Sequence, residues 1–448
     1  MVSRRRLAAI VISLALGLVG LELVTAAYFS LSGNRGFIYK AKVISAPHNQ
    51  EQSTPVTRFY VSPYLGFVRA PHTPLREIID YSRLEAMAKP DTTPAWFDSR
   101  TNNHGFLSRR DYPVQKVDPK DFVIGLFGGS VAQNFALQGE AALFDALRQE
   151  PGLRTRNLIL VNLSSGGYKQ PQQLLALCYY LSLGQSFDFV INIDGFNELA
   201  LAALNQASNI APSMPDSQQM VPLANLATIS SDVSSFVNTA RLLELREAVA
   251  DNVRRQKNCF SALCHAWHAL DGIARTRRYQ SMLQMVVPQS PQSLVQLQPA
   301  QEEHADVTSY IAIWRRSTQA MHALLASQRT PYLHVLQPNQ YVSKHRFSSE
   351  ERKVALNPKS GYRAAIEQGY PKLRDDVMNL RTNGFPIVDA SKIFDDEDTW
   401  VFSDDCCHYN QTGNELLARV IATAATDVIQ QREPLRVASP AADNSRAR

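Results

Sequence analysis

The stretch that decides the fold is residues 121–130, which read Asp-Phe-Val-Ile-Gly-Leu-Phe-Gly-Gly-Ser. Its apolar part is short and lies between polar Lys120 and two glycines, which predicts a buried β-strand. Gly128 and Gly129 then predict a tight turn that leaves Ser130 at the C-terminal end of the strand. Functional sites of open α/β sheets form at that edge. Because a serine in a turn is common in proteins of every function, this stretch alone does not predict an enzyme.

A second stretch, Asp405-Cys406-Cys407-His408, contains the residue types that activate a serine. A serine hydroxyl is a weak nucleophile until a base takes its proton. Asp405 and His408 are three positions apart, so both side chains share one face of a turn or of a first helical turn. We therefore expect Asp405 to orient the imidazole of His408 toward Ser130.

Two further segments place small and amide residues after strands. Residues 157–162 predict a second strand, which is followed by Gly166-Gly167-Tyr168. Residues 187–193 predict a third strand, which is followed by Asp194-Gly195-Phe196-Asn197-Glu198. Four strand ends or late turns thus carry, in chain order, Ser130, Gly167, Asn197 and the pair Asp405 and His408.

These four blocks, in this order, resemble the SGNH hydrolase family, also called the GDSL esterases and lipases. The resemblance covers roughly residues 120–200 and 330–425. It implies that Ser130 is the nucleophile, His408 the general base and Asp405 its partner. It also implies an oxyanion hole formed by the backbone N–H groups of Ser130 and Gly167 and by the side-chain amide of Asn197. Such donors stabilise the negative charge that develops on the carbonyl oxygen during acyl transfer.

The chain departs from the family pattern at two positions. Gly129 stands where the family name has aspartate, and Glu198 stands where aspartate is usual. Neither position supplies the transferred proton or the oxyanion hole, so the mechanism remains possible. An α/β-hydrolase is the competing fold, because Gly128-Gly-Ser130-Val-Ala132 nearly fits the motif GxSxG. The final glycine of that motif is missing, and that fold has several strands before its serine.

The rest of the core continues the alternation of strands and helices. Residues 331–336 and 385–389 predict two more strands, and helical patterns cover residues 172–183, 310–328, 361–380 and 412–431. Such alternation predicts a parallel sheet with helices on both faces. The SGNH resemblance adds the flavodoxin-like strand order 2-1-3-4-5. The expected fold class is therefore a three-layer α/β/α sandwich.

The domain organisation follows from these elements. We expect residues 33–115 to form an extension that packs on the core and residues 116–430 to form the hydrolase-like domain. Residues 431–448 predict a disordered tail. A helical insertion at about residues 199–305 follows a strand end, so we expect a cap that shapes access to Ser130. Within it, residues 288–301 are rich in Gln, Ser and Pro and predict a flexible loop or lid. In the extension, His104 is expected to be structural.

Residues 1–32 predict a membrane anchor. Arg4, Arg5 and Arg6 precede an apolar run at residues 7–31 that is interrupted chiefly by Glu22. This run is long enough to span a bilayer as a helix, and the preceding positive charge predicts an extracytoplasmic, periplasmic position for the remainder. The alternative is a cleaved signal peptide, because Val24-Thr-Ala26 approximates a cleavage site.

Composition excludes other classes of protein. The chain has 448 residues, of which 45% are hydrophobic and 19% charged, enough for a large core. Its net charge of +5 is accounted for by the arginines at positions 4–6 and by residues 432–448. No nucleic-acid partner is therefore expected. No cofactor motif is present, and the oligomeric state stays open.

The cysteines fit an exported domain. Cys259 and Cys264 bracket a short segment and can form a disulfide, whereas Cys178 lies in an apolar helical pattern and is expected to be buried. Cys406 and Cys407 are either small buried residues, the interpretation we favour, or part of a redox-sensitive loop. Cys259, Cys264, His265 and His268 match no standard zinc spacing, so no metal is expected.

Together these patterns predict a membrane-anchored serine esterase that forms an acyl-enzyme with an acyl group of a carbohydrate or lipid. An O-acyltransferase acting on an envelope polysaccharide shares the first half-reaction and is an alternative. A catalytically silent binding or assembly protein of the same fold is the alternative from another class.

Overall fold

The computed structural model describes residues 4–31, 59–79, 81–88, 94–228, 233–257, 259, 261–286 and 306–431. The chain divides into two compact units. One consists of residues 1–56 and 224–296, and the other of residues 57–223 and 297–448. The predicted loop at residues 288–301 and the tail that follows residue 431 lie outside the described residues.

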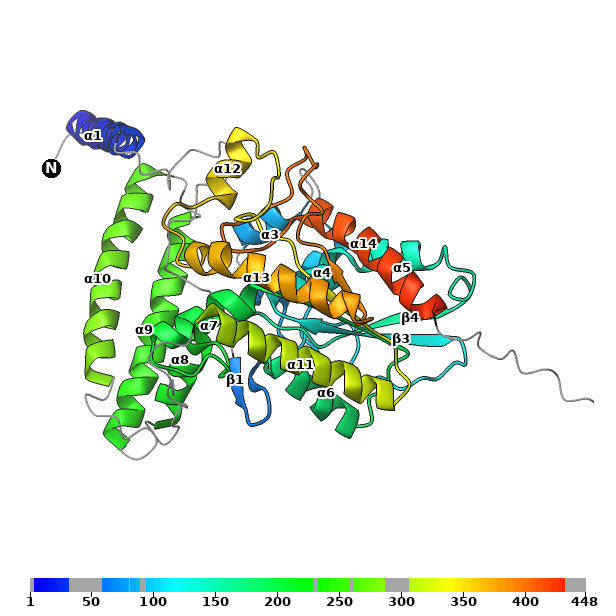
Figure 1. Cartoon of the computed structure of the whole chain (residues 1–448). Helices are drawn as coiled ribbons and strands as arrows, with labels where there is room; N and C mark the ends of the chain where they lie inside the picture. Colours follow the sequence, from blue (N-terminus) through cyan, green and yellow to red (C-terminus); the bar gives the residue numbers. More distant parts are fainter. Residues whose placement is uncertain are drawn as a thin grey trace, which may run out of the picture. The chain divides into compact units, whose positions relative to one another are not determined.

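The larger unit contains a five-stranded parallel sheet in the order β4-β3-β5-β6-β7 (Figure 1). Its strands are β3 (Asp121–Gly128), β4 (Asn157–Asn162), β5 (Phe189–Asp194), β6 (Tyr332–Leu336) and β7 (Ile387–Asp389). Numbered along the sequence within this sheet, the order is 2-1-3-4-5, as expected. β3 is the second strand from one edge and carries Ser130 just beyond its C-terminal end.

Helices cover both faces of this sheet. The helices of this unit are α4 (Ser130–Gln138), α5 (Glu140–Leu147), α6 (Gln172–Ser182), α7 (Phe196–Ala207), α11 (Val307–Ser327), α12 (Ser349–Ala355), α13 (Arg363–Thr382) and α14 (Gln411–Gln430), and α8 (Ser217–Thr228) begins in it. Because successive side chains of a strand point to opposite faces, β3 supplies two cores. Ile124 and Leu126 belong to a core shared with α4, α5 and α14. Val123 and Phe127 belong to a second core shared with α6 and part of α11. The predicted layered α/β architecture is therefore present.

The described part of the extension packs on this second core. It contains the antiparallel hairpin β1 (Phe59–Ser62) and β2 (Gly66–Arg69), the helices α2 (Leu75–Ile78) and α3 (Tyr81–Met87), and the 3₁₀ helix η1 (Ala95–Asp98). The rings of Phe67 and Phe106 both contact Tyr168 edge to face. His104 Nδ1 lies 2.8 Å from the Tyr180 hydroxyl, a contact between the extension and α6 that fits a structural role.

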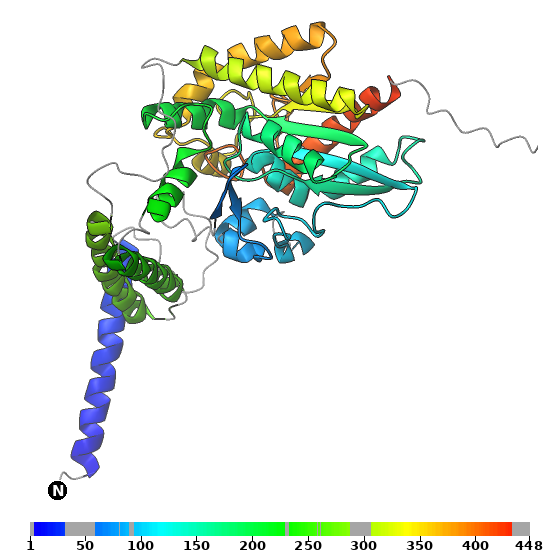
Figure 2. The ribbon, with the colours of Figure 1, turned by 90° about the horizontal axis from the view of Figure 1, so that it is seen from below.

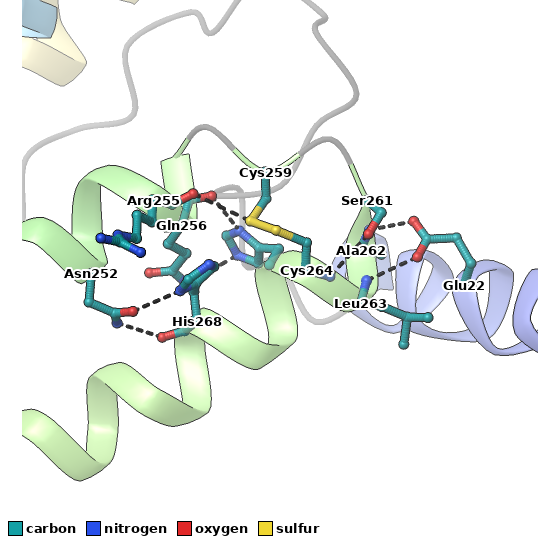
Figure 3. Close-up of a disulfide and its surroundings, with 11 residues drawn as sticks. Glu22, Asn252, Arg255, Gln256, Cys259, Ser261, Ala262, Leu263, Cys264 and His268 are labelled. Atoms are coloured by element: carbon teal, nitrogen blue, oxygen red, sulfur yellow. Dashed lines mark hydrogen bonds between the residues drawn. A yellow bond between two sulfur atoms is a disulfide. The ribbon is translucent and has the colours of Figure 1, made fainter.

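The smaller unit is helical and contains α1 (Arg4–Leu31), α9 (Val233–Lys257) and α10 (Ala262–Val286), with α10 packed against both α9 and α1 (Figure 2). The Glu22 carboxylate of α1 accepts hydrogen bonds from the backbone N–H groups of Ala262 and Leu263 (Figure 3). An acidic group at this position satisfies amides that a helix N-terminus leaves without an intrahelical acceptor. Glu22, which interrupts the apolar run, thus joins α1 to α10.

A disulfide joins Cys259, which follows α9, to Cys264 in the first turn of α10, a pairing that the spacing allowed (Figure 3). Since both sulfurs are bonded to each other, they offer no thiolate to a metal ion, and the adjacent His268 bonds to Asn252 through Nδ1 at 2.8 Å. Cys178, in contrast, is exposed rather than buried. It lies on the outer side of α6, although the apolar pattern of that helix suggested otherwise.

The expected membrane anchor is not supported. Within the described part of the chain, none of the helices combines the length and the apolar character that crossing a membrane requires. α1 forms over most of residues 1–32, but it contains the charged Glu22, and that carboxylate is engaged by α10.

Candidate active site

Ser130 is the first residue of α4 and follows β3 through a turn that needs glycine. Gly128 has a φ of +142°, and a Cβ at this position would lie 2.2 Å from the backbone oxygen of Ile193 on the neighbouring strand β5. No side chain fits there, so the glycine allows β3 to end against β5 and turn into α4. As the first helical residue, Ser130 has a backbone N–H without an intrahelical acceptor, and it lies at the positive end of the helix dipole.

A chain of two hydrogen bonds connects Ser130 to a carboxylate. Ser130 Oγ lies 2.7 Å from His408 Nε2, and His408 Nδ1 lies 2.6 Å from Asp404 Oδ2. Because an ionised carboxylate can only accept, Nδ1 carries a proton, and in the neutral ring Nε2 is the atom that accepts the serine O–H. The structure thus brings together the serine and histidine that the sequence selected, from segments 278 positions apart.

The carboxylate partner is Asp404 and not Asp405, which corrects the sequence-based assignment. The chain folds after Asp404 so that its Oδ1 accepts the backbone N–H groups of Cys406, Cys407 and His408 at 3.0, 3.2 and 3.2 Å. This arrangement directs Oδ2 at the imidazole. Asp405 faces another way, and its Oδ2 accepts a 2.8 Å hydrogen bond from Asn357 Nδ2.

The surroundings of His408 favour its protonated form. The ring is buried, which by itself lowers the pKa. The charge of Asp404, the Cys407 sulfur and the hydrogen bonds that both make to the ring outweigh burial, and they raise the pKa of His408 above its ordinary value of 6.5. Because its pKa is raised, His408 holds a proton firmly once it has taken one from Ser130.

The loop that carries Asp404 and His408 is fixed by a buried pair that sequence patterns did not single out. Glu351 of α12 is 1% exposed, and its Oε1 accepts the backbone N–H groups of Val401 and Phe402, each at 2.9 Å. Its Oε2 lies 2.9 Å from His345 Nε2. The loop is therefore held at its start by a carboxylate from a distant segment.

Of the expected oxyanion-hole residues, Asn197 lies against the turn that precedes Ser130. Asn197, in the first turn of α7, lies so close to the turn that a Cβ on Gly129 would be 2.2 Å from its Nδ2. One hydrogen of this amide is donated to Tyr168 O at 2.8 Å, and no acceptor for the second hydrogen is found among the described residues. The space of Gly129 is therefore occupied by Asn197, which explains why an aspartate at position 129 would not fit here.

Gly167 lies in the turn after β4 with a φ of +84°, a conformation that favours glycine. Among the described residues, no hydrogen bond of the Gly167 amide is found. The preceding Gly166 borders Ser130, because a Cβ on Gly166 would lie 3.9 Å from Ser130 Cβ. The Gly166 amide donates a 3.2 Å hydrogen bond to Gln133 Oε1, which holds the turn on α4.

Glu198, the second departure from the family pattern, has a structural role. Its Oε1 accepts hydrogen bonds from Gln170 N and Gln173 Nε2, both at 3.1 Å, and its Oε2 accepts one from Gly195 N at 2.8 Å. Burial and then the charge of Asp194 raise its pKa to about 8. The carboxyl group caps α7 and ties it to the segment before α6, and thereby fixes the neighbouring Asn197.

The two cysteines between Asp405 and His408 are free thiols. Their sulfurs are 3.5 Å apart, and Cys407 is 1% exposed within the core that contains α14. The interpretation of Cys407 as a small buried residue agrees with this environment. Cys406 is partly exposed.

Arg69 also reaches the site, although no sequence signal marked it. It is the last residue of β2 and is 8% exposed, with its guanidinium over the Phe59 ring, 4.7 Å from the ring centroid. Its Nη2 lies 3.4 Å from the point that a Cβ on Gly166 would occupy, the same point that is 3.9 Å from Ser130 Cβ. The extension therefore places a positive charge beside the serine.

Comparisons with known proteins add little to this geometry. No protein-family model matches the chain, and no curated protein matches it. One similar solved structure is the crystal structure of an acetyl xylan esterase, AlAXEase. The alignment covers 68% of this chain and 99% of the esterase chain, with 14% identity and a TM-score of 0.30. At that TM-score the likeness carries no argument about activity.

Proposed function

We propose that this protein is an SGNH-type serine esterase that acts through an acyl-enzyme. The observation that carries the proposal is the hydrogen-bonded chain Asp404–His408–Ser130 at the C-terminal edge of a parallel sheet. A nucleophile bonded to a base, and a base bonded to an orienting carboxylate, is the arrangement that activates serine in unrelated hydrolases.

In the proposed reaction, Ser130 Oγ attacks the carbonyl carbon of an ester while His408 Nε2 takes the hydroxyl proton. Asp404 holds the ring in the required tautomer and stabilises the imidazolium. The N–H groups of Ser130 and Gly167 and the second amide hydrogen of Asn197 receive the developing oxyanion. His408 then gives its proton to the leaving alcohol, and water, activated by the same histidine, releases the acid and regenerates Ser130.

The proposed substrates are acyl esters of carbohydrates or lipids. We further propose that the protein works in an extracytoplasmic compartment. The Cys259–Cys264 disulfide supports this location, because disulfides persist mainly in oxidising compartments. Alkylation of free thiols directly in cells, followed by mass measurement, tests it. Protection of these two cysteines is expected, and full alkylation would contradict the location.

The activity itself is tested with a fluorophosphonate probe on the full-length protein. We expect labelling that disappears in Ser130→Ala and is strongly reduced in His408→Ala. Circular dichroism and thermal unfolding of each variant exclude misfolding as the cause. Absence of labelling in the folded protein would contradict the esterase and would favour a silent binding protein.

A further inference from the structure

The position of Arg69 points to the charge of the substrate. We propose that Arg69 forms a subsite for a carboxylate located next to the scissile ester, so that the preferred substrate is the ester of an acidic sugar. This inference rests on the proposed esterase function and specifies its substrate class.

Arg69 lies close to Ser130. Arg69 Nη2 and Ser130 Cβ lie within 3.4 and 3.9 Å of one point, where a Cβ on Gly166 would be. Gly166 carries no side chain, so the guanidinium and the serine border the same small space. Gly166 and Ser130 are both partly exposed, so solvent reaches this part of the site. A group bound there is within a few bonds of the carbonyl that Ser130 attacks.

Arg69 is held in place by two contacts within the extension. A Cβ on Gly105 would lie 2.1 Å from the Arg69 backbone oxygen, so the loop at Gly105 packs directly on the backbone of Arg69. The guanidinium lies over the Phe59 ring, 4.7 Å from its centroid, and this contact restricts the orientation of the side chain. An arginine whose orientation is fixed loses little conformational entropy when it binds an anion.

The chemistry of the arginine side chain favours a carboxylate. Guanidinium is permanently charged and presents a planar fork of donors that matches a carboxylate in two parallel hydrogen bonds. In a site of low dielectric constant this charge attracts an anion more strongly than it would in water. A neutral sugar at the same place offers no complementary charge, so the difference between acidic and neutral esters is a measurable consequence.

The proposal is tested with two matched esters, an O-acetylated methyl glucuronoside and the corresponding O-acetylated methyl glucoside. They differ only in a carboxylate against a hydroxymethyl group. For the full-length protein we expect kcat/KM to be at least about tenfold higher for the acidic ester, with a preference that declines at high salt.

The variant Arg69→Gln is expected to lose roughly 10- to 100-fold on the acidic ester and less than about threefold on the neutral ester. Arg69→Lys keeps the charge but not the planar fork of donors. Its kcat/KM on the acidic ester is expected to lie between the values of the wild type and of Arg69→Gln. Arg76→Gln, which removes an exposed arginine of the same extension, is the matched control and is expected to change neither rate.

Equal losses on both esters in Arg69→Gln would overturn the subsite, because a group that stabilises the oxyanion or the fold affects both substrates alike. A wild-type protein without preference for the acidic ester would also overturn it. If Ser130 reacts with the fluorophosphonate probe and neither ester is cleaved, the esterase function stands and the substrate class is wrong. If the probe does not react at all, the proposed function itself fails.

Discussion

The assignment of Asp404 rather than Asp405 as the partner of His408 gives the sharpest prediction, tested by Asp404→Asn. The substitution keeps the shape of the side chain. Its oxygen can still accept the three backbone N–H groups that Asp404 Oδ1 accepts. Its NH₂ group, however, would then face the Nδ1–H of the imidazole, 2.6 Å away in the native protein. Two donors at that distance repel, so the ring loses either its tautomer or its position.

We expect kcat to fall by roughly 10³- to 10⁴-fold, the range for an amide that imposes the wrong tautomer on a catalytic histidine. At 1.36 kcal/mol for each factor of ten, this is about 4 to 5.5 kcal/mol of transition-state stabilisation. The assay is the hydrolysis of a chromogenic acetate ester, with thermal unfolding to confirm that the variant folds.

The matched control is Asp405→Asn. Its carboxylate bonds to Asn357 and not to the histidine, so we expect a loss of activity of less than about fivefold. If Asp405→Asn lost as much activity as Asp404→Asn, or if Asp404→Asn kept near-native activity, the geometric reasoning would be refuted.

Three further predictions concern pH, the oxyanion hole and stability. His408 must be neutral to accept a proton, and its pKa is raised. We therefore expect kcat/KM to increase with pH, with an apparent pKa above 6.5 that is assigned to His408. A pH profile that levels off below pH 6.5 would contradict the raised pKa. In Gly129→Ala the added Cβ would lie 2.2 Å from Asn197 Nδ2 and displace this amide, so we expect turnover to be about 10²- to 10³-fold slower. Gly152→Ala is the control, because nothing lies within 4 Å of its added Cβ, and its turnover should be unchanged. Replacing both cysteines of the α9–α10 disulfide by serine should cost about 2 kcal/mol of stability, measured by denaturant unfolding; an unchanged unfolding curve contradicts a stabilising role.

The sheet could be predicted from the sequence because its signals are local. Residues 121–128 and the four other apolar runs are short, rich in branched side chains and bounded by turn residues, which suffices to predict strands. The strand order came from the family resemblance and agrees with the structure. Ser130 and His408 were selected through the order of four short blocks that resembles the SGNH hydrolases, since neither the glycine turn nor the Asp-Cys-Cys-His stretch is specific by itself.

Other features could not be predicted from the sequence, because they depend on contacts between distant segments. The apolar pattern of α6 suggested a buried Cys178, but the side of the helix that meets the core is decided by packing, and Cys178 is exposed. The apolar run before residue 32 suggested a membrane anchor, which the described helices do not support. Whether α9 and α10 form a cap over Ser130 stays a prediction.

The sequence by itself determined the five strands and the glycine turn before Ser130, because periodicity and turn chemistry act between neighbouring residues. The choice of His408 came from the resemblance to the SGNH hydrolases. Only the tertiary structure decided between Asp404 and Asp405, since adjacent aspartates differ by the direction in which one turn of backbone points them. It also placed Arg69 beside the serine and Glu351 beneath the catalytic loop. These contacts join segments that are far apart in the chain, and no local pattern encodes which of them meet in the folded protein.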